Sequence, residues 1–322
     1  MNFVQIALQA QGSIHPLIIP SELTNGLGLM NPSILIDEDK ILVVLRSVSY
    51  TFYHSEKKLF QHQWGPLTYV HPEHDMHLRT INYYLELDDN YNITRYNKID
   101  TSKFPDKELW EFVGLEDARI FRWNGKLYTS GVRRDLDTIG TGRMELCEIV
   151  VDQNNVTEVS RVRIQPPNDP NSYCEKNWMP VLDQPNVYVK WTNPTEVVEI
   201  NPDTTESKTI FLGNRYNLPR DIRGGSQVIP WRDYYIAMTH EVDLFNSEVE
   251  RKDAIYYHRI IIWDKNWNIV KWSNQFSLMG GHVEFCIGLA HKDDYFLMTF
   301  GFQDNAAYLL KFPESIIEEV LN

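Results

Sequence analysis

The stretch "GLEDARIFRWNGKLYTSG", residues 114–131, decides the fold class. Apolar and aromatic residues flank Asn124 and Gly125, and an Asn-Gly pair between two β-rich runs is the strongest short signal for a tight hairpin turn. The first strand nevertheless opens with Glu116, Asp117 and Arg119, where a buried strand would carry apolar side chains. The sequence therefore predicts a β-hairpin whose first residues have a role other than packing in the core.

Four other stretches have the same design of polar lead-in, apolar strand, polar turn, β-rich strand and polar exit. They are "NPSILIDEDKILVVLRS" (31–47), "EKNWMPVLDQPNVYVKWTNP" (175–194), "RGGSQVIPWRDYYIAMTHEV" (223–242) and "EFCIGLAHKDDYFLMTFGFQD" (284–304). Most steps between successive turns are roughly 50–60 residues, near the blade length of a β-propeller. We predict an all-β fold, a single five-bladed β-propeller domain over residues 1–322 with a central active-site cavity; a pair of β-sandwiches is the alternative.

Helical periodicity is confined to two places. "PESIIEEVLN" at the C-terminus predicts a short helix, and "DKELWEF" (106–112) predicts a short helix or an ordered loop.

Composition limits the classes of function. The net charge of −13 argues against nucleic acid as a partner, because a phosphate backbone requires a broad basic surface. The three cysteines have no metal-ligand spacing and are expected to be free thiols. We see no signal peptide and no apolar run long enough for a membrane span, so a cytoplasmic location is expected, with a homo-oligomer left open.

The polar residues at the hairpin entries and exits are the candidate site. In a propeller the innermost strands line a central channel, so their ends can aim side chains into one cavity. A carboxylate among several cations suits a sugar ring beside a phosphate group. The alternative is that each is a surface residue near a turn. The set comprises Asn31, Arg46, Glu116, Asp117, Arg119, Lys176, Asn177, Arg223, His240, Glu284 and Asp304.

Two other kinds of site are not expected. His71, His74 and His77 in "HPEHDMH" lack a surrounding Cys/His framework, so we interpret them as part of a polar loop and predict no metal. The glycine-containing stretches "GLGL" and "GTGR" lack the spacing of a nucleotide-binding loop.

The order of these motifs, "NP…R", "G-x-E-D-x-R-I", "K-N", "GG…H" and a late "FG-x-x-D", resembles glycoside hydrolase family 130, the β-mannoside phosphorylases and hydrolases. It equally resembles the β-1,2-mannosyltransferases of glycosyltransferase family 108. The resemblance covers residues 31–304 and implies a five-bladed propeller. It also implies that Asp117 is the general acid, protonating the leaving oxygen through a hydroxyl of the bound mannose.

The resemblance also divides the other candidate residues into phosphate-binding and sugar-binding positions, except Arg223 and Glu284. The phosphate-binding positions would be Lys176 and His240, with Arg119, Arg133 and Arg134 as further candidates. The sugar-binding positions would be Asn31, Arg46, Glu116, Asn177 and Asp304. No cofactor is implied, only inorganic phosphate or a sugar phosphate as co-substrate.

Departures from the family leave the reaction open. Ala118 stands where the family usually has proline, and the paired Arg133 and Arg134 are unlike many phosphorylases. Our first hypothesis is inverting phosphorolysis of a β-mannosidic bond, or its reverse from mannose 1-phosphate. The alternatives are a β-mannosyltransferase that uses GDP-mannose and a glycan-binding propeller without turnover. A hydrolase is least favoured, since Glu116 or Glu284 would then have to activate water.

Overall fold

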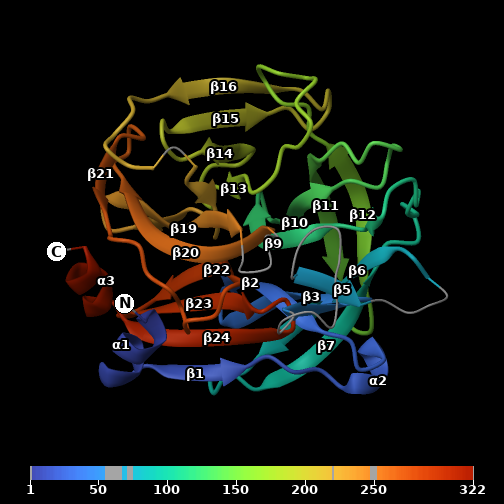
Figure 1. Cartoon of the computed structure of the whole chain (residues 1–322), viewed down its shortest axis with the longest axis horizontal. Helices are drawn as coiled ribbons and strands as arrows, with labels where there is room; N and C mark the ends of the chain where they lie inside the picture. Colours follow the sequence, from blue (N-terminus) through green and yellow to red (C-terminus); the bar gives the residue numbers. More distant parts are fainter. Residues whose placement is uncertain (1, 55–66, 71–74, 220, 247–251, 322) are drawn as a thin grey trace.

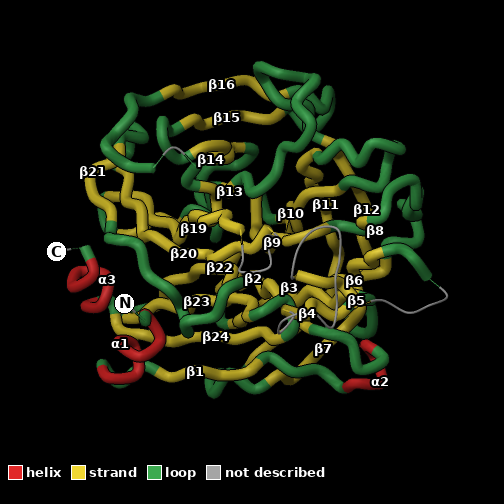
Figure 2. Tube along the Cα trace, viewed as in Figure 1, coloured by secondary structure: helices red, strands yellow, loops and turns green. Residues whose placement is uncertain are grey.

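The computed structural model describes residues 2–54, 67–70, 75–219, 221–246 and 252–321, and strands dominate it. In this part of the chain the helices are few and short, and they lie at the periphery (Figure 2): α1 (Phe3–Gln9), α2 (Ser21–Thr24) and α3 (Ser315–Val320). The predicted β-rich chain and its C-terminal helix are confirmed. The helices α1 and α2 were not predicted, and residues 106–111 form a loop rather than a helix.

Each of the five predicted hairpins is present, with its turn where the sequence placed it. The strand pairs are β2 (Leu29–Asp37) with β3 (Lys40–Val48), β9 (Glu116–Trp123) with β10 (Lys126–Arg133), β13 (Met179–Pro180) with β14 (Val187–Trp191), β18 (Ile229–Trp231) with β19 (Tyr234–Asn246), and β22 (Glu284–Lys292) with β23 (Tyr295–Phe302). At the Asn-Gly turn both residues have a positive φ, 49° for Asn124 and 76° for Gly125. Positive φ at both positions is what a two-residue hairpin turn of this kind requires.

Further antiparallel strands extend these hairpins outward. The order β2-β3-β6-β7 uses β6 (Leu78–Leu87) and β7 (Ile93–Asp100), and β9-β10-β11-β12 uses β11 (Arg143–Val151) and β12 (Val156–Arg163). The third order, β13-β14-β15-β16, adds β15 (Glu196–Ile200) and β16 (Ser207–Leu212). The fourth, β17-β19-β20-β21, adds β17 (Arg223–Gly224), β20 (Lys252–Trp263) and β21 (Ile269–Trp272).

Two short elements lie beside these sheets. Strand β8 (Phe112–Val113) pairs in parallel with β6, and β4 (Thr51–His54) pairs with β5 (Leu67–Val70).

The N-terminal strand completes the last sheet. Strand β1 (Ser13–Pro16) pairs with β24 (Ala306–Pro313), giving the order β1-β24-β23-β22, with Ile14 opposite Leu310. The two ends of the chain are thus hydrogen-bonded into one sheet. Figure 1 shows the sheets around a common centre, with β2, β9, β13 and β22 inward and β1, β12, β16 and β21 outward.

The first two hairpins belong to one continuous sheet. Strands β7 and β12 pair in parallel over two positions, Val156 with Ile99 and Thr157 with Asp100. This short pairing joins two four-stranded runs into one sheet, and β8, which pairs with β6, is its ninth strand. The division into five separate blades therefore stays a prediction.

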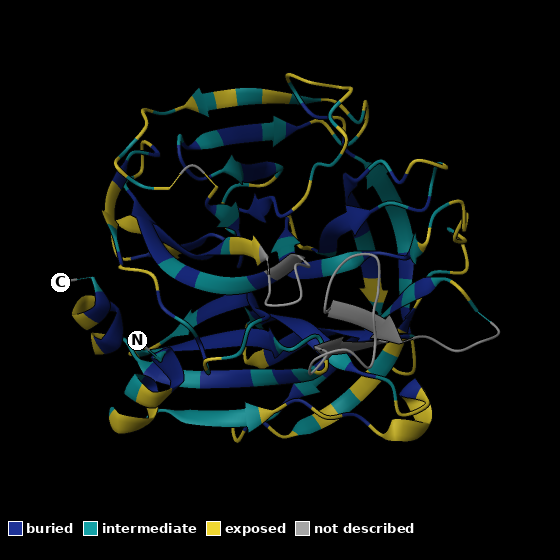
Figure 3. Ribbon diagram, viewed as in Figure 1, coloured by how far each residue is buried: buried dark blue, intermediate teal, exposed yellow. Residues whose placement is uncertain are grey.

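A buried glutamine ties the inner strands together. Nε2 of Gln227 lies 3.0 Å from Ser33 Oγ, 2.8 Å from the carbonyl oxygen of Ile34 and 2.7 Å from that of Ile120. Its Oε1 accepts a hydrogen bond of 3.3 Å from the backbone of Leu289. One side chain thus fixes β2, β9 and β22 relative to one another. Figure 3 shows these inner strands as the most buried part of the fold.

The cysteines agree with the expectation of free thiols. All three cysteines are free; Cys147 and Cys286 are buried and Cys174 is half-buried. None of the helices in the described residues has the length and apolar character needed to cross a membrane.

Candidate active site

Four polar lead-in or exit residues share an unusual backbone conformation. Asn31, Asp117, Asn177 and Asp304 have φ angles of 43°, 53°, 62° and 49°. Asn and Asp adopt this left-handed region more readily than other side chains, and residues held there gather at functional sites. The strand pairs β2–β3 and β9–β10 are also irregular beside Asn31 and Asp117. The hairpin entries are therefore shaped to re-aim individual side chains.

Asp117 lies at the meeting point of two hairpins. Its Oδ1 accepts a hydrogen bond of 2.8 Å from Asn31 Nδ2 and one of 2.9 Å from Arg46 Nη1. Its backbone carbonyl accepts a further bond of 2.9 Å from Arg119 Nη1. Asn31 and Asp117 are 86 residues apart in the sequence. Both side-chain bonds end on Oδ1, so neither ties down the second carboxylate oxygen.

Arg46 is the buried cation that organises the carboxylates. Besides Asp117, its guanidinium donates to Thr80 Oγ1 at 3.0 Å and to Tyr50 Oη at 3.1 Å, and it lies 3.6 Å from Glu116 Oε2. Only 4% of Arg46 is exposed. Burial favours loss of its proton, but Tyr50 and the surrounding carboxylates raise its pKa above the ordinary value. A buried charge of this kind depends on its partners.

The carboxyl groups of the site have pKa values shifted in opposite directions. Burial raises the pKa of Asp304 to about 6, reinforced by Asp117 and Glu116 and opposed by Arg46. Burial also raises the pKa of Glu116. Burial alone would do the same to Asp117, but Arg46, the bond from Asn31, and then Arg119 and Lys176 hold its pKa below the usual value. In the free protein Asp117 is therefore a carboxylate at neutral pH.

We expect Asp304→Asn to stabilise the fold by about 1–3 kcal/mol at about pH 7.5, because the ionised carboxyl is costly where it lies. The unfolded carboxyl ionises near its ordinary pKa of 3.8, whereas the folded one keeps its proton up to about 6. The stability of the wild type therefore falls as the pH rises from about 4 to about 6, and the full cost of the ionised carboxyl is present above about pH 6. The advantage of the variant should shrink as pH falls toward about 4.

Urea unfolding of the wild type and the variant at both pH values measures this difference. Asp89→Asn is the matched control, because the Asp89 side chain is 90% exposed. An Asp304→Asn protein no more stable than the control at about pH 7.5 would contradict the raised pKa.

Lys176 and Arg119 act electrostatically on both Asp117 and His240, so these cations belong to the same cluster. The electrostatic influence of Lys176 reaches Glu116, Asp117 and His240, so all four groups are neighbours. Lys176 is exposed. Nε of Arg119 donates to the carbonyl of Gly225 at 2.7 Å, and its Nη2 has no hydrogen-bond partner among the described residues. Burial lowers the pKa of Arg119 to about 10, which leaves it charged at neutral pH.

Two tyrosines complete the cluster, and the sequence analysis missed both. Tyr256 in β20 stacks on His240 with ring centroids 5.7 Å apart, and burial followed by Asp304 raises its pKa to about 12. Tyr50 contacts Arg46, as described above. Tyr50 follows the exit of the first hairpin, so the lead-in and exit rule could have found it. Tyr256 lies on the third strand of its sheet, where the rule did not search.

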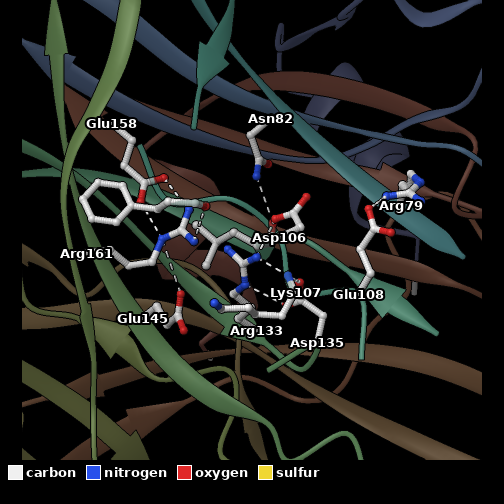
Figure 4. Close-up of polar contacts among 12 residues, drawn as sticks. Arg79, Asn82, Asp106, Lys107, Glu108, Arg133, Asp135, Glu145, Glu158 and Arg161 are labelled. Atoms are coloured by element: carbon white, nitrogen blue, oxygen red, sulfur yellow. Dashed lines mark hydrogen bonds and ion pairs between the residues drawn. The ribbon is translucent and has the colours of Figure 1, made fainter. Parts of the chain in front are cut away.

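The predicted arginine pair is divided between two environments. Nε and Nη2 of Arg133 donate to Asp135 at 2.7 and 2.9 Å, and Nη2 also donates to Asp106 at 2.5 Å. These contacts belong to a separate buried network with Glu145 (Figure 4), so the structure does not bring Arg133 into the cluster around Asp117. Arg134 instead lies close enough to Glu116 to oppose the rise in its pKa.

Of the remaining lead-in residues, one lies near the cluster and one has a structural role. Arg223 pairs with Asp221 at 2.6 Å and acts electrostatically on His240. The buried Glu284 carboxylate accepts backbone bonds from Leu278, Met279 and Gly281 at 2.6–2.8 Å.

The histidine loop shows no metal site in the part that can be described. His71 and His74 lie outside the described residues. His77 contacts Asp75 at 3.1 Å, and Asp75 also pairs with Arg79. No group of three or more metal-ligating side chains is found among the described residues.

Fold and site together define a class: a β-rich protein in which hairpins distant in sequence bring three carboxyl groups and several cations together. No protein-family model matches the chain, and no curated protein matches it by sequence. Solved structures do. The β-1,2-mannobiose phosphorylase of Listeria innocua is 13% identical, with a TM-score of 0.55 over 92% of each chain.

Two further structures extend the similarity. One was described with the finding that the GH130 family of mannoside phosphorylases contains hydrolases targeting β-1,2 mannosidic linkages in Candida mannan; it is 14% identical, with a TM-score of 0.57 over 90% of this chain and 85% of that one. The mannose phosphorylase MPT-4 of Leishmania mexicana, in complex with a phosphate ion, is 11% identical, with a TM-score of 0.52 over 99% and 96%. The resemblance to glycoside hydrolase family 130 is thus confirmed in the fold.

Proposed function

We propose that this protein is a mannoside-processing enzyme built on a five-bladed β-propeller, and that it exchanges a β-mannosidic bond for a bond to phosphate. The observation that supports this most is the setting of Asp117: Asn31 and Arg46 orient it, and Lys176, Arg119 and His240 lie alongside. The mannoside phosphorylases among the structural neighbours have a similar fold. Inorganic phosphate is the co-substrate, and no other cofactor is required.

In the proposed reaction a phosphate oxygen attacks the anomeric carbon from the face opposite the leaving group. The bond from that carbon to the bridging oxygen breaks, and its electron pair stays on the bridging oxygen. That oxygen takes a proton from a hydroxyl of the bound mannose, which takes the proton of Asp117. The products are mannose 1-phosphate of inverted configuration and the shortened sugar. Phosphate is already a nucleophile, so no base is needed.

Asp117 must gain a proton before it can act as the acid. In the free protein the cations hold it ionised. A bound phosphate dianion would offset the charges of Lys176 and Arg119 and add negative charge nearby, and both effects raise the pKa of a neighbouring carboxyl. The acid form of Asp117 therefore arises when both substrates are bound. This arrangement limits protonation of Asp117 in the empty site.

A hydrolytic reaction has less support, because it requires a base for water. The three backbone bonds to Glu284 occupy its carboxylate, and Glu116 lies 3.6 Å from Arg46. A GDP-mannose-dependent transferase would need further cations for the diphosphate of its donor, which the pair Arg133 and Arg134 could supply. Arg133 is engaged by Asp106 and Asp135, so only Arg134 remains for that role.

A comparison of donors tests the proposal. The protein is incubated with β-1,2-mannobiose and other β-mannosides plus phosphate, and in reverse with mannose 1-phosphate or GDP-mannose plus mannose. We expect ³¹P NMR to show mannose 1-phosphate formed in the first direction and consumed in the second, with GDP-mannose unchanged. GDP release would instead support the transferase, and sugar binding without any product would support a non-catalytic glycan-binding protein.

A further inference from the structure

One ring nitrogen of His240 has its hydrogen-bond role fixed by the backbone. Nδ1 lies 3.0 Å from the carbonyl oxygen of Gly224. A carbonyl oxygen can only accept, so Nδ1 carries a hydrogen and donates it. The ring is held by Tyr256 on one side, stacked at an interplanar angle of 4°, and by Phe285, whose centroid is 4.5 Å away. The tautomer and the orientation of the ring are therefore both set.

The surroundings of His240 keep it neutral. Only 2% of the residue is exposed. The charged and titratable groups that act on it are Arg223 of β17, Arg119 of β9, Lys176 before β13 and His258 of β20. Burial, followed by these groups, lowers the pKa of His240 well below its ordinary value. The nearby carboxylates Asp117 and Asp304 act on the phenol of Tyr256, which covers the ring.

A neutral imidazole with its hydrogen on Nδ1 has only a lone pair on Nε2. That atom can accept a hydrogen bond but cannot donate one. Nε2 of His240 makes no hydrogen bond with any described residue. Its neighbours Lys176 and Arg119 are donors only, suited to unprotonated oxygens. The cluster thus presents donors at several points and an acceptor at one.

We propose that Nε2 of His240 accepts a hydrogen bond from the P–OH group of bound phosphate, so that the site selects protonated tetrahedral anions and rejects sulfate. This inference rests on the proposed function and names what its anion subsite recognises. Phosphate keeps a proton on one oxygen throughout the neutral pH range, whereas sulfate has none. Arsenate carries the equivalent As–OH group and should be accepted.

The same contact suits both sides of the proposed reaction. Attack on the anomeric carbon uses an unprotonated phosphate oxygen, and the P–OH proton stays where it is. The sugar phosphate therefore still carries one P–OH group immediately after the transfer. His240 moves no proton in this scheme. Its Nε2 accepts a hydrogen bond from the P–OH group both before and after the transfer.

Rejection of sulfate should be strong. A sulfate oxygen in place of the P–OH would set lone pairs against the lone pair of Nε2 and leave that atom unpaired. Sites built to hydrogen-bond a hydroxyl discriminate against analogues that lack it by large factors, so we expect sulfate to bind at least about 100-fold more weakly than phosphate.

The test measures anion binding by calorimetry and competition in phosphorolysis, with inorganic phosphate, arsenate and sulfate at about pH 7.5. In the wild type, phosphate and arsenate should bind in the same range, and sulfate at least about 100-fold more weakly. His240→Gln places an amide that can donate near the position of Nε2, and should bring the sulfate ratio within about tenfold. His291→Gln is the matched control, because His291 pairs with Glu314 instead and should keep the wild-type ratio.

The outcomes separate this inference from the proposed function. If the protein catalyses phosphorolysis but sulfate competes for the anion subsite with an affinity equal to that of phosphate, the inference alone is overturned. Nε2 of His240 would then be assigned to a sugar hydroxyl instead of the P–OH group. A sulfate ratio that stays unchanged in a folded His240→Gln protein would also overturn it. Absence of both phosphate binding and phosphorolysis would overturn the proposed function together with the inference. The wild-type sulfate competition decides even if His240→Gln does not fold.

Discussion

Replacing Asp117 by asparagine is expected to lower kcat for phosphorolysis by about 10²–10⁴-fold, the range contributed by a positioned general acid. The amide keeps the shape of the side chain and can still accept from Asn31 and Arg46, but it has no proton to give. The measurement is the steady-state rate of mannose 1-phosphate release with saturating phosphate and β-mannoside. KM for the mannoside should change far less than kcat, since the variant loses the proton and not the binding contacts.

Asp89→Asn serves as the control for this variant as well. It makes the same chemical change at an exposed position and should retain the wild-type rate. Circular dichroism and urea unfolding of both variants show whether the fold is kept. An Asp117→Asn enzyme that is folded and as fast as the control would remove Asp117 from the role of acid, and would direct attention to Asp304, whose pKa burial raises to about 6.

Replacing Arg46 by methionine is expected to lower the free energy of unfolding by about 3–5 kcal/mol, the usual cost of removing one partner of a buried ion pair. Asp117, Tyr50 and Thr80 would each lose a donor, and the half-buried Asp117 and Glu116 would lose their shared cation. The pKa of Asp117 should rise as a result. Urea unfolding at neutral pH measures the loss.

Lys40→Met is the matched control for Arg46→Met. It removes a lysine that pairs with Glu86 at 3.1 Å with its own side chain 63% exposed, and exposed pairs contribute at most about 1 kcal/mol. If the two variants lost equal stability, Arg46 would not be the cation on which the site depends. Arg46→Lys should fall between them, because an ammonium cannot reproduce the branched contacts of the guanidinium.

The hairpins could be predicted because their signals are local. The turn at Asn124 and Gly125 requires positive φ at both positions, and Asn and Gly tolerate it at low cost. The alternating apolar residues on either side of the turn then predict two strands. The pairing of β1 with β24 could not be predicted in this way. It joins Ile14 to Leu310, and nothing in either short segment identifies the other.

The candidate site was found by a rule about position, and its successes and misses follow from that rule. Asn31, Asp117 and Arg46 are in contact, as expected of hairpin ends that share a centre. Glu284 obeys the same rule but is used to hold backbone amides. Tyr256 reaches the site from the third strand of its sheet. A prediction of this contact requires the three-dimensional arrangement of that sheet, which the sequence alone does not provide.

Charge states lay beyond the sequence altogether. The sequence shows several carboxyl groups and several cations, but only the packing decides which carboxyl keeps its proton. Arg46 and Asn31 both bind Asp117, whose pKa falls, while the half-buried Asp304 is opposed in its pKa rise by Arg46 alone. His240 was expected to act among the cations, whereas burial among cations keeps it neutral.

A crystal of the protein soaked with mannose and inorganic phosphate tests the central claim most directly, because it shows whether the hairpin ends form one site. The account predicts an anion within hydrogen-bonding distance of Lys176 and His240, and a mannose ring between that anion and Asp117. An anion bound elsewhere, or a sugar that leaves Asp117 out of reach of its hydroxyls, would contradict it.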